Sequence, residues 1–347
     1  MTSIPQAPSF AVVSGLAVRT VLAGRERAVV DLIEAAYRLH GGGETTNPPS
    51  YFLRFPDQPA NRIIALPASV GGDVNTAGIK WISSFPANVA NGLPRASAVL
   101  ILNDLTTGYP YACLESSVIS AVRTAASAAL AAVRMAGKRQ ARGRVGFFGT
   151  GLIARYIHQY LAALDWPFEE ISVFDASAER ARAFGAYLED ASGRPVHQAA
   201  DPEELIRGSD LVAFATTAAA PHVCEPSWFN HHPLVLNVSL RDLSPEVLLE
   251  SVNILDDVEH CLKADTSPHL VEQRTGNRDF IDGTLYDVLT GALAVPEDRT
   301  VVFSPFGLGV LDLALGAFVH EESRKSGDLA VIDGFFSELD AGHVGRR

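Results

Sequence analysis

The sequence is poor in cysteine, the residue that builds disulfide frameworks and most structural zinc sites. Its 347 residues include three cysteines, Cys113, Cys224 and Cys261, which are widely spaced and form no C-x-x-C pair. This usage argues against a structural zinc site or a disulfide framework and is typical of a reducing cytoplasm. The histidines between residues 222 and 232 flank a loop and lack helix or strand spacing, so we expect no metal there.

Basic runs and long apolar runs are also missing. The net charge is −12 and no segment is rich in Lys or Arg, which argues against a nucleic-acid or anionic-membrane partner. The longest apolar helix that we predict, around Ala125–Ala136, is interrupted by Arg134 and is too short to span a membrane. Met1–Pro5 lacks a basic region followed by an apolar core, so we expect no signal peptide. The composition favours a soluble cytoplasmic enzyme, and the chain is long enough for two domains.

A glycine-rich turn lies between an apolar run and a helical pattern. Gly149, Gly151 and Ala154 form G-x-G-x-x-A after the apolar run Val145–Phe148, and residues 155–164 continue at helical period. The first glycine allows a tight turn, the second lets backbone approach a pyrophosphate, and the small third residue lets the helix pack on the strand. The N-terminus of that helix would hold the phosphates.

A carboxylate follows at the distance that a dinucleotide site requires. The next apolar strand ends at Asp175, 26 positions after Gly149, where an acidic residue can bond an adenine-ribose hydroxyl. Asp175 would repel a 2′-phosphate and Ala176 offers no cation, so we expect NAD, although Arg180 and Arg182 keep NADP open. The predicted contacts of this segment are Gly149, Thr150, Gly151, Leu152, Ile153 and Asp175.

Strand and helix patterns alternate through the second part of the chain. The predicted strands are Val145–Phe148, Ile171–Phe174, Pro195–His197, Leu211–Thr216, Leu234–Val238, Val252–Leu255 and Thr300–Phe303. The predicted helices between them include Ala178–Asp190, Pro202–Arg207 and Pro245–Glu250. This alternation implies a parallel sheet with helices on both faces. We therefore expect an α/β fold, a Rossmann-type doubly wound parallel sheet, over residues 126–314.

The first 125 residues have a different pattern. An amphipathic helix is predicted at Ala28–Arg38. The β-like runs, separated by turn formers, are Arg62–Leu66, Gly78–Ile82, Ala96–Leu102 and Tyr109–Leu114. They predict an α+β domain with a mostly antiparallel sheet. A helical tail from about Gly316 is expected to return to it, so residues 1–125 with 315–347 form the predicted substrate-binding and dimerisation domain.

Three polar residues stand out on physical grounds. Lys80 interrupts an apolar β-like run, where an ammonium requires an anion or a solvated pocket; a sheet-face lysine that reaches solvent is the alternative. Arg123 is predicted at the start of an Ala-rich helix, where the helix dipole does not stabilise a cation. An arginine at such a position is better explained by a role in binding a carboxylate ligand. Asp242 follows a strand that should end at the carboxyl edge of the sheet. Its alternative role is the N-cap of the helix that begins near Pro245, but Ser244 already suits that role.

Five segments in a fixed order carry a resemblance to a known family. They are Gly78–Ser83, Arg123–Ser127, the G-x-G-x-x-A turn, Asn237–Asp242 and Ser304–Gly309. Together they resemble the ornithine cyclodeaminase/μ-crystallin family over nearly the whole chain. The segments Asn47–Pro56, Ile79–Pro86 and Pro94–Ser97 are similar to the branch that forms 2,3-diaminopropionate for siderophores and peptide antibiotics.

The resemblance implies a reaction and roles for individual residues. That branch oxidises N-(1-amino-1-carboxy-2-ethyl)-glutamate with NAD+, and hydrolysis of the imine yields 2-oxoglutarate and L-2,3-diaminopropionate. Lys80 would lie beside the substrate carboxylate and the reacting carbon, Arg123 and Arg54 would bind carboxylates, and Asp242 would be the general acid/base. Arg62 and Arg95 are reserve carboxylate ligands. The further cofactor contacts implied are Thr124, Thr216, Thr217, Ser239, Phe306 and Gly307.

Several alternatives remain open at this point. An ornithine cyclodeaminase would return the hydride, but the strand Ile63–Pro67 lacks the acidic residue of those enzymes and Arg241-Asp242 replaces their Gly-Asp. An alanine dehydrogenase, a ketimine reductase and a non-catalytic binding protein of the μ-crystallin type are the others. A homodimer through the N-terminal sheet, and a PLP-dependent synthase that supplies the substrate, are the partners that the resemblance implies.

Overall fold

The chain forms two compact units, which are described separately. The computed structural model describes residues 9–336; the expectation of no signal peptide at Met1–Pro5 lies outside them, as does the end of the tail after Phe336. The first unit comprises Met1–Arg25, Gly42–Ser120 and Gly309–Arg347, and the second comprises Glu26–Gly41 and Ala121–Leu308.

The first unit is built on a mostly antiparallel sheet. Its strands are β1 (Phe10–Val13), β2 (Thr45–Thr46), β3 (Tyr51–Arg54), β4 (Arg62–Val70), β5 (Thr76–Ser84), β6 (Ala96–Asp104), β7 (Pro110–Glu115) and β16 (Ala330–Ile332). The order is β16-β1-β7-β6-β5-β4-β2, and β3 also pairs with β4. Within the described part of this sheet, β1 and β7 form the one parallel pair. The remaining elements are α1 (Gly15–Leu22), the 3-10 helix η1 (Pro86–Asn91) and α11 (Gly309–Ser326).

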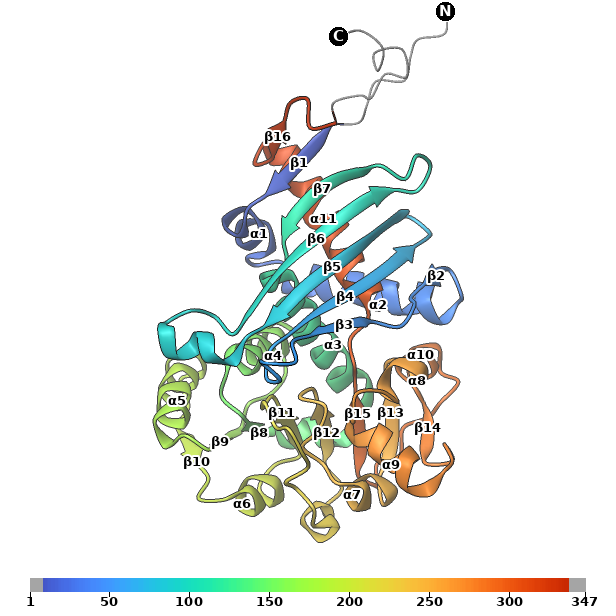
Figure 1. Ribbon diagram of the computed structural model, residues 1–347. Coiled ribbons are helices and arrows are strands. Elements are labelled where there is room, and N and C mark those ends of the chain that lie inside the picture. Colours follow the sequence, from blue (N-terminus) through green and yellow to red (C-terminus); the bar gives the residue numbers. More distant parts are fainter. Residues whose placement is uncertain (1–8, 337–347) are drawn as a thin grey trace, which may run out of the picture. The chain divides into compact units, whose positions relative to one another are not determined.

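Helix α11 covers one face of this sheet. Figure 1 shows it, in red, along the strands β4 to β7, which it contacts. Residues Leu66, Lys80, Leu100 and Leu114 are cross-strand neighbours in one row, and all four are buried. Because side chains alternate along a strand, the neighbouring row lies on the opposite face of the sheet.

The second unit is a doubly wound parallel sheet. Its strands are β8 (Arg144–Phe148), β9 (Glu170–Phe174), β10 (Val196–Gln198), β11 (Leu211–Phe214), β12 (Leu234–Asn237), β13 (Val252–Leu255), β14 (Ile281–Thr284) and β15 (Val301–Ser304). Every pair in the order β10-β9-β8-β11-β12-β15-β13-β14 is parallel. The central strands β11, β12, β13 and β15 are buried on both faces, as their continuous apolar runs predict. The predicted α/β class with a second, α+β unit is confirmed.

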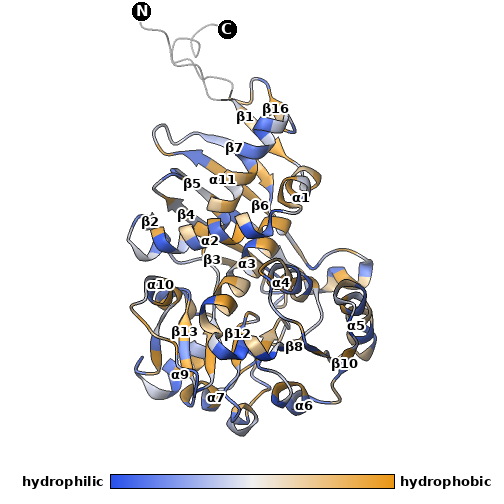
Figure 2. Cartoon of the chain, turned by 180° about the vertical axis from the view of Figure 1, so that it is seen from behind, coloured by the Kyte–Doolittle hydropathy of each residue, from blue (hydrophilic) through white to orange (hydrophobic). Residues whose placement is uncertain are grey.

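Helices of several lengths accompany this sheet. They are α2 (Glu26–Gly41), α3 (Ser117–Met135), α4 (Leu152–Ala163), α5 (Ala178–Ser192), α6 (Pro202–Arg207), α7 (Pro245–Leu249), α8 (Val258–Cys261), α9 (Ser267–Thr275) and α10 (Leu285–Thr290), with 3-10 helices η2 (Gly137–Arg142) and η3 (Pro226–Phe229). Figure 2 shows hydrophilic and hydrophobic residues mixed along α5. Its buried side is formed by Ala181, Phe184, Gly185 and Leu188, as expected of a helix that covers a sheet.

The two units differ from the expected domains in their limits. The unit boundaries fall after Ser120 and after Leu308 rather than after residues 125 and 314, and α2 groups with the second unit. Helix α2 packs against α4 and α10, and the Tyr37 hydroxyl lies 2.7 Å from the Ser127 hydroxyl. Amphipathicity identifies a buried helix face but not the partner against which it packs.

Two predicted helices are longer than the sequence analysis proposed. Helix α11 begins at Gly309, not near Gly316, which places Asp312 in its first turn. Helix α3 has 19 residues and is long and apolar enough to cross a membrane, so the expectation that it is too short was wrong. However, 67% of its most apolar stretch is buried inside the protein, and the core helix of a soluble protein has the same length and composition.

Candidate active site

The glycine turn after β8 requires glycine at its first position. Gly149 has a φ of +85°, and a Cβ built on it would lie 2.7 Å from the carbonyl oxygen of Ala215. Its N–H donates to the Phe174 carbonyl at 2.8 Å, which ties the turn to the end of β9. Gly151 is the N-cap of α4, and a Cβ there would meet no atom within 4 Å. The turn therefore leaves open space in front of the α4 N-terminus.

A cleft of about 610 Å³ lies at this edge of the parallel sheet. It brings together six of the predicted cofactor residues: Gly149, Thr150, Gly151, Asp175, Thr216 and Thr217. Arg180 and His222 also line it. Leu152 and Ile153 form the first turn of α4, and the Leu152 side chain is exposed. The first backbone N–H groups of a helix have no partner within the helix and can bind phosphate oxygens.

Asp175 is fixed in place at one end of the cleft. Its carboxylate accepts from the Thr150 N–H at 3.0 Å, the Thr150 hydroxyl at 2.9 Å and the Ser177 N–H at 2.9 Å. The two oxygens of a carboxylate offer about four lone-pair positions, so a ribose hydroxyl can still be accepted. The open space at Gly151 and this fixed carboxylate fit the diphosphate and the adenine ribose of a dinucleotide.

Asp242 is the centre of a buried hydrogen-bond group. It is 0% exposed, and its carboxylate accepts from the Thr216 hydroxyl at 2.5 Å and from the Ser239 hydroxyl. The third partner is His222, whose Nε2 lies 2.9 Å from Oδ1 of Asp242. The structure thus brings Thr216, Ser239 and Asp242 together from the ends of β11 and β12, as their positions in the sequence predict.

The turn that carries Asp242 is strained. Leu240 has a φ of +80°, a left-handed conformation that is unfavourable for leucine. The turn is held by the Ser267 N–H, which donates to the Leu240 carbonyl at 2.7 Å, and by Arg241, whose Nη2 donates to the Ala264 carbonyl at 2.6 Å. Backbone strain of this kind persists where the surroundings fix the geometry, and such places cluster at functional sites.

The loop after β15 is fixed by a buried carboxylate. Asp256 accepts from the Phe306 N–H at 2.9 Å and the Gly307 N–H at 2.7 Å, and burial raises the pKa of its carboxyl. Gly307 has a φ of +93°, and a Cβ on it would lie 2.3 Å from Nη1 of Arg123. The guanidinium of Arg123 therefore packs directly on this loop. Thr124 is the next residue of α3 and is half-buried.

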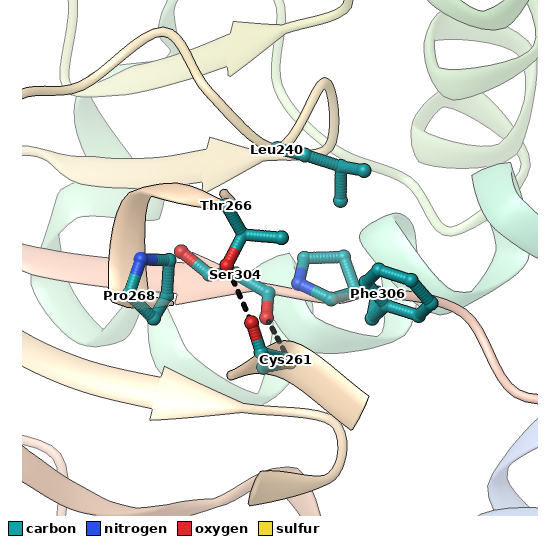
Figure 3. Close-up of a pocket in the computed structure, with 7 residues that line it drawn as sticks. Leu240, Cys261, Thr266, Pro268, Ser304 and Phe306 are labelled. Carbon is teal, nitrogen blue, oxygen red and sulfur yellow. Dashed lines mark hydrogen bonds between the residues drawn. The ribbon is translucent and has the colours of Figure 1, made fainter. Parts of the chain in front are cut away.

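A small pocket beside this loop is filled by its own side chains. Figure 3 shows the residues that line it, among them Leu240, Cys261, Thr266 and Phe306, and the pocket has no room for a water molecule. The Cys261 thiol donates to the Ser304 carbonyl at 3.1 Å and to Asp256 at 3.0 Å, and burial raises its pKa well above the usual value. Cys261 is a packed core residue rather than a nucleophile.

In the first unit Lys80 has a buried counter-ion. Its Nζ donates to Oδ2 of Asp312 at 2.6 Å and to the Ser120 hydroxyl at 3.2 Å. The side chain of Lys80 is 2% exposed and that of Asp312 is 0% exposed, so Lys80 does not reach solvent from the sheet face. Asp312 was missed in the sequence analysis because it was assigned to the other domain. Its position within the apolar run Leu311–Leu315 is the signal that marks it.

The other three arginines that were considered as carboxylate ligands lie in the first unit, at or next to the ends of strands. Arg54 ends β3 opposite Arg62 on β4, and its guanidinium lies 5.2 Å from the centre of the Phe52 ring. Arg95 donates to the Ser84 hydroxyl at 3.1 Å. Arg54 is exposed and Arg62 is half-buried, so Arg54 has the more accessible guanidinium.

The parallel sheet, the glycine turn and the cleft beside Asp175 define a dinucleotide-binding unit of the Rossmann type. The sequence profile of the ornithine cyclodeaminase/mu-crystallin family matches residues 15–327. The chain belongs to this family, as the order of its five motifs predicts.

Three relatives illustrate the similarity. N-((2S)-2-amino-2-carboxyethyl)-L-glutamate dehydrogenase from Staphylococcus aureus is 28% identical over 311 residues, which cover 85% of this chain and 90% of the relative. CmnK, which has a crystal structure, is 32% identical in sequence to this chain. The two structures match over 95% of this chain and 99% of the CmnK chain, with a TM-score of 0.85. An archaeal alanine dehydrogenase dimer with bound NAD has a TM-score of 0.84 at 23% identity, over 94% of this chain and 100% of its own. The last similarity shows the fold alone.

Proposed function

We propose that the protein is an NAD-dependent dehydrogenase that acts on a secondary amine of amino-acid origin. Its substrate is N-(1-amino-1-carboxy-2-ethyl)-glutamate, and its products are 2-oxoglutarate and L-2,3-diaminopropionate. The cleft is the observation that carries the cofactor half of the proposal, because it combines the glycine turn with a fixed carboxylate, Asp175. The Staphylococcus aureus relative, named for a glutamate derivative of this kind, supports the substrate half.

Guanidinium groups bind the substrate carboxylates. Arg123 packs on Gly307, in the loop that we assign to the nicotinamide side of the cofactor. A planar guanidinium binds a carboxylate through two parallel hydrogen bonds, which fixes the orientation of the substrate as well as its position. Arg54 is the second carboxylate ligand. Positioning of this kind lowers a barrier by about 7 kcal/mol or more when the reacting atoms are held in line.

Proton transfer is assigned to the Asp242 group and charge stabilisation to Lys80. Bound NAD+ would accept the hydride from the Cα of the glutamyl part. The substrate ammonium must first lose a proton, so that the nitrogen lone pair can form the C=N bond as the hydride leaves. Water then adds to the imine carbon, and the C–N bond breaks to release the oxo acid and the amine. Asp242 serves this proton transfer, and Lys80, held by Asp312, stabilises the negative charge of the substrate carboxylate next to the reacting carbon.

A homodimer through the first unit is part of the proposal. Tyr51, Ala65, Trp81 and Val99 are cross-strand neighbours in a row on the sheet face opposite α11. Three of these apolar side chains are exposed: Tyr51 by 68%, Trp81 by 41% and Val99 by 39%. An exposed apolar row on a sheet is a typical subunit interface. The archaeal alanine dehydrogenase, a dimer, has the same fold.

The cellular setting follows from the chemistry. The protein acts in the cytoplasm, where NAD is available, in a pathway that supplies 2,3-diaminopropionate to a siderophore or a peptide antibiotic. A PLP-dependent synthase would form the substrate from amino acids, because making a C–N bond at the β-carbon of an amino acid is chemistry that this cofactor supplies.

The test is a substrate panel with purified protein and NAD+. NADH absorbance is followed with N-(1-amino-1-carboxy-2-ethyl)-glutamate, with L-ornithine and with L-alanine, and the products are identified by mass spectrometry. The proposal predicts NADH with the first substrate only, together with L-2,3-diaminopropionate. Proline formed from ornithine without net NADH would identify a cyclodeaminase, and pyruvate from alanine an alanine dehydrogenase. NAD+ binding without turnover of any of the three would favour a binding protein.

A further inference from the structure

The carboxylate assigned to proton transfer is closed off from the cleft. Asp242 is 0% exposed and is not among the residues that line the cleft. Its carboxylate accepts from the hydroxyls of Thr216 and Ser239 and lies next to a ring nitrogen of His222. A carboxylate in such surroundings has no direct path to a substrate or to water.

One of these three partners is a titratable group on the cleft wall. His222 lines the cleft, and its side chain is 36% exposed. Its Nε2 lies 2.9 Å from Oδ1 of Asp242, so the neutral ring has its proton on Nε2 and an acceptor lone pair on Nδ1. This is the geometry of a base that is oriented by a buried carboxylate.

Backbone hydrogen bonds fix His222 and Asp242 relative to each other. The N–H groups of His222 and Val223 both donate to the Asp242 carbonyl at 3.0 Å, and the Ser244 N–H donates to the Val223 carbonyl at 3.0 Å. The His222 ring also lies beside the Phe148 ring, with centroids 5.2 Å apart. The segment around His222 and the turn around Asp242 therefore form one fixed piece of the cleft wall.

The position of this pair favours the nicotinamide half of the cofactor. The phosphate-binding turn follows β8, and Asp175, which marks the adenosine side, follows β9. The His222–Asp242 pair lies beyond the ends of β11 and β12, on the other side of β8 in the sheet order. A dinucleotide bound across a doubly wound sheet has its two halves on opposite sides of the central strand.

We infer that His222 is the proton-accepting group of the cleft and that Asp242 acts through it as a positioning residue. This inference rests on the proposed function and deepens it. The substrate ammonium gives one proton to Nδ1 of His222, and the freed nitrogen lone pair forms the C=N bond as the hydride leaves for NAD+. The proton then passes to solvent through the exposed part of the ring. The charged side chains that line the cleft are Asp175 and Arg180.

The first arm of the test needs no substrate. The Cε1–H resonance of His222 is assigned in histidine-labelled protein as the signal that is lost in His222→Gln, and it is followed as NAD+ is added. We expect the resonance to shift when NAD+ binds, and to have a different chemical shift in Asp242→Asn, because the amide cannot replace the carboxylate that accepts from Nε2 at 2.9 Å. A resonance that ignores both NAD+ and Asp242→Asn overturns the inference.

The second arm is a double-mutant cycle on turnover of the diaminopropionate precursor. General base catalysis contributes about 100-fold or more, so His222→Gln and Asp242→Asn should each lower kcat/KM by at least about 100-fold. The double variant should lose no more than either single variant, since the two residues act as one unit. His197→Gln is the matched control, because His197 forms the same kind of pair with Glu204, at 2.9 Å, outside the cleft.

The outcomes separate the roles. Full activity in His222→Gln with loss of activity in Asp242→Asn would overturn the inference in favour of direct action by Asp242. Weaker NAD+ binding in His222→Gln with unchanged kcat would overturn it in favour of a cofactor contact. If the wild-type protein turns over none of the candidate amines, the proposed function fails, and the resonance experiment alone decides whether His222 faces the cofactor under the control of Asp242.

Discussion

The two glycines of the phosphate-binding turn should respond to alanine in opposite ways. At Gly149 the φ of +85° is unfavourable for alanine, and the new Cβ would lie 2.7 Å from the Ala215 carbonyl oxygen. The left-handed conformation costs about 1–2 kcal/mol. Because a backbone atom cannot move aside as a flexible side chain can, we expect a total loss of about 2–4 kcal/mol of folding free energy.

At Gly151 the same methyl group meets no atom within 4 Å, and a φ of −83° suits alanine. Gly151→Ala should therefore change the free energy of unfolding by less than about 0.5 kcal/mol. The methyl group would, however, occupy the space through which the diphosphate approaches the backbone. We expect NAD+ affinity to fall at least about tenfold, which corresponds to about 1.4 kcal/mol.

The assay compares the two variants without and with cofactor. Thermal unfolding followed by circular dichroism should show Gly149→Ala melting roughly 5–15 °C below the wild type, at about 2–4 °C per kcal/mol for a unit of this size. Gly151→Ala should melt with the wild type but bind NAD+ weakly in isothermal titration calorimetry. Wild-type affinity in Gly151→Ala, or a wild-type melting temperature in Gly149→Ala, would refute the reading of this turn.

Three further predictions concern single side chains. Asp175→Ala should weaken NAD+ binding by about tenfold or more relative to NADP+ binding, since a charged hydrogen bond is worth about 1.5–3 kcal/mol. An unchanged ratio of the two dissociation constants would mean that Asp175 does not bind the ribose. Lys80→Met should cost about 3–5 kcal/mol in urea unfolding, because it removes the buried ammonium that lies 2.6 Å from the Asp312 carboxylate. Adding Asp312→Leu should restore much of the loss, and no recovery in the double variant would mean that the pair is not the cause. Burial lowers the pKa of His158 from 6.5 to about 4, so on acidification the unfolded chain takes up a proton before the folded protein does. The free energy of unfolding should therefore fall between pH 6.5 and pH 4, by up to about 3 kcal/mol. The pH dependence of the melting temperature should be flatter in His158→Phe, and an equal slope in both proteins would contradict this.

Most of the parallel sheet was predictable because most of its strands are short segments rich in apolar residues. Every predicted strand from Val145 onward is present, with ends that differ by at most two residues. Strand β14 was not predicted: its sequence Ile281–Thr284 contains aspartate and glycine, and it is a strand only through its pairing with β13 at the edge of the sheet. Local sequence does not reveal such pairing.

Residues of the cleft were predictable where motif spacing defines them, and contacts across the fold were not. The glycine turn, Asp175, Thr216 and Thr217 come together because parallel strands end at one edge. The partner of Lys80 is Asp312, 232 residues away along the chain, and the pair forms only when α11 covers the sheet. The same holds for His222, which was interpreted as a loop residue and lies against Asp242 through the pairing of two loops.

The most direct test of the account is the stoichiometry of one reaction. Purified protein is mixed with NAD+ and a limiting amount of N-(1-amino-1-carboxy-2-ethyl)-glutamate, and NADH and 2-oxoglutarate are measured at completion. The account predicts one NADH and one 2-oxoglutarate for each substrate molecule consumed. Substrate that is bound or consumed without net NADH, or NADH that forms without 2-oxoglutarate, would contradict oxidation at the glutamyl carbon followed by hydrolysis.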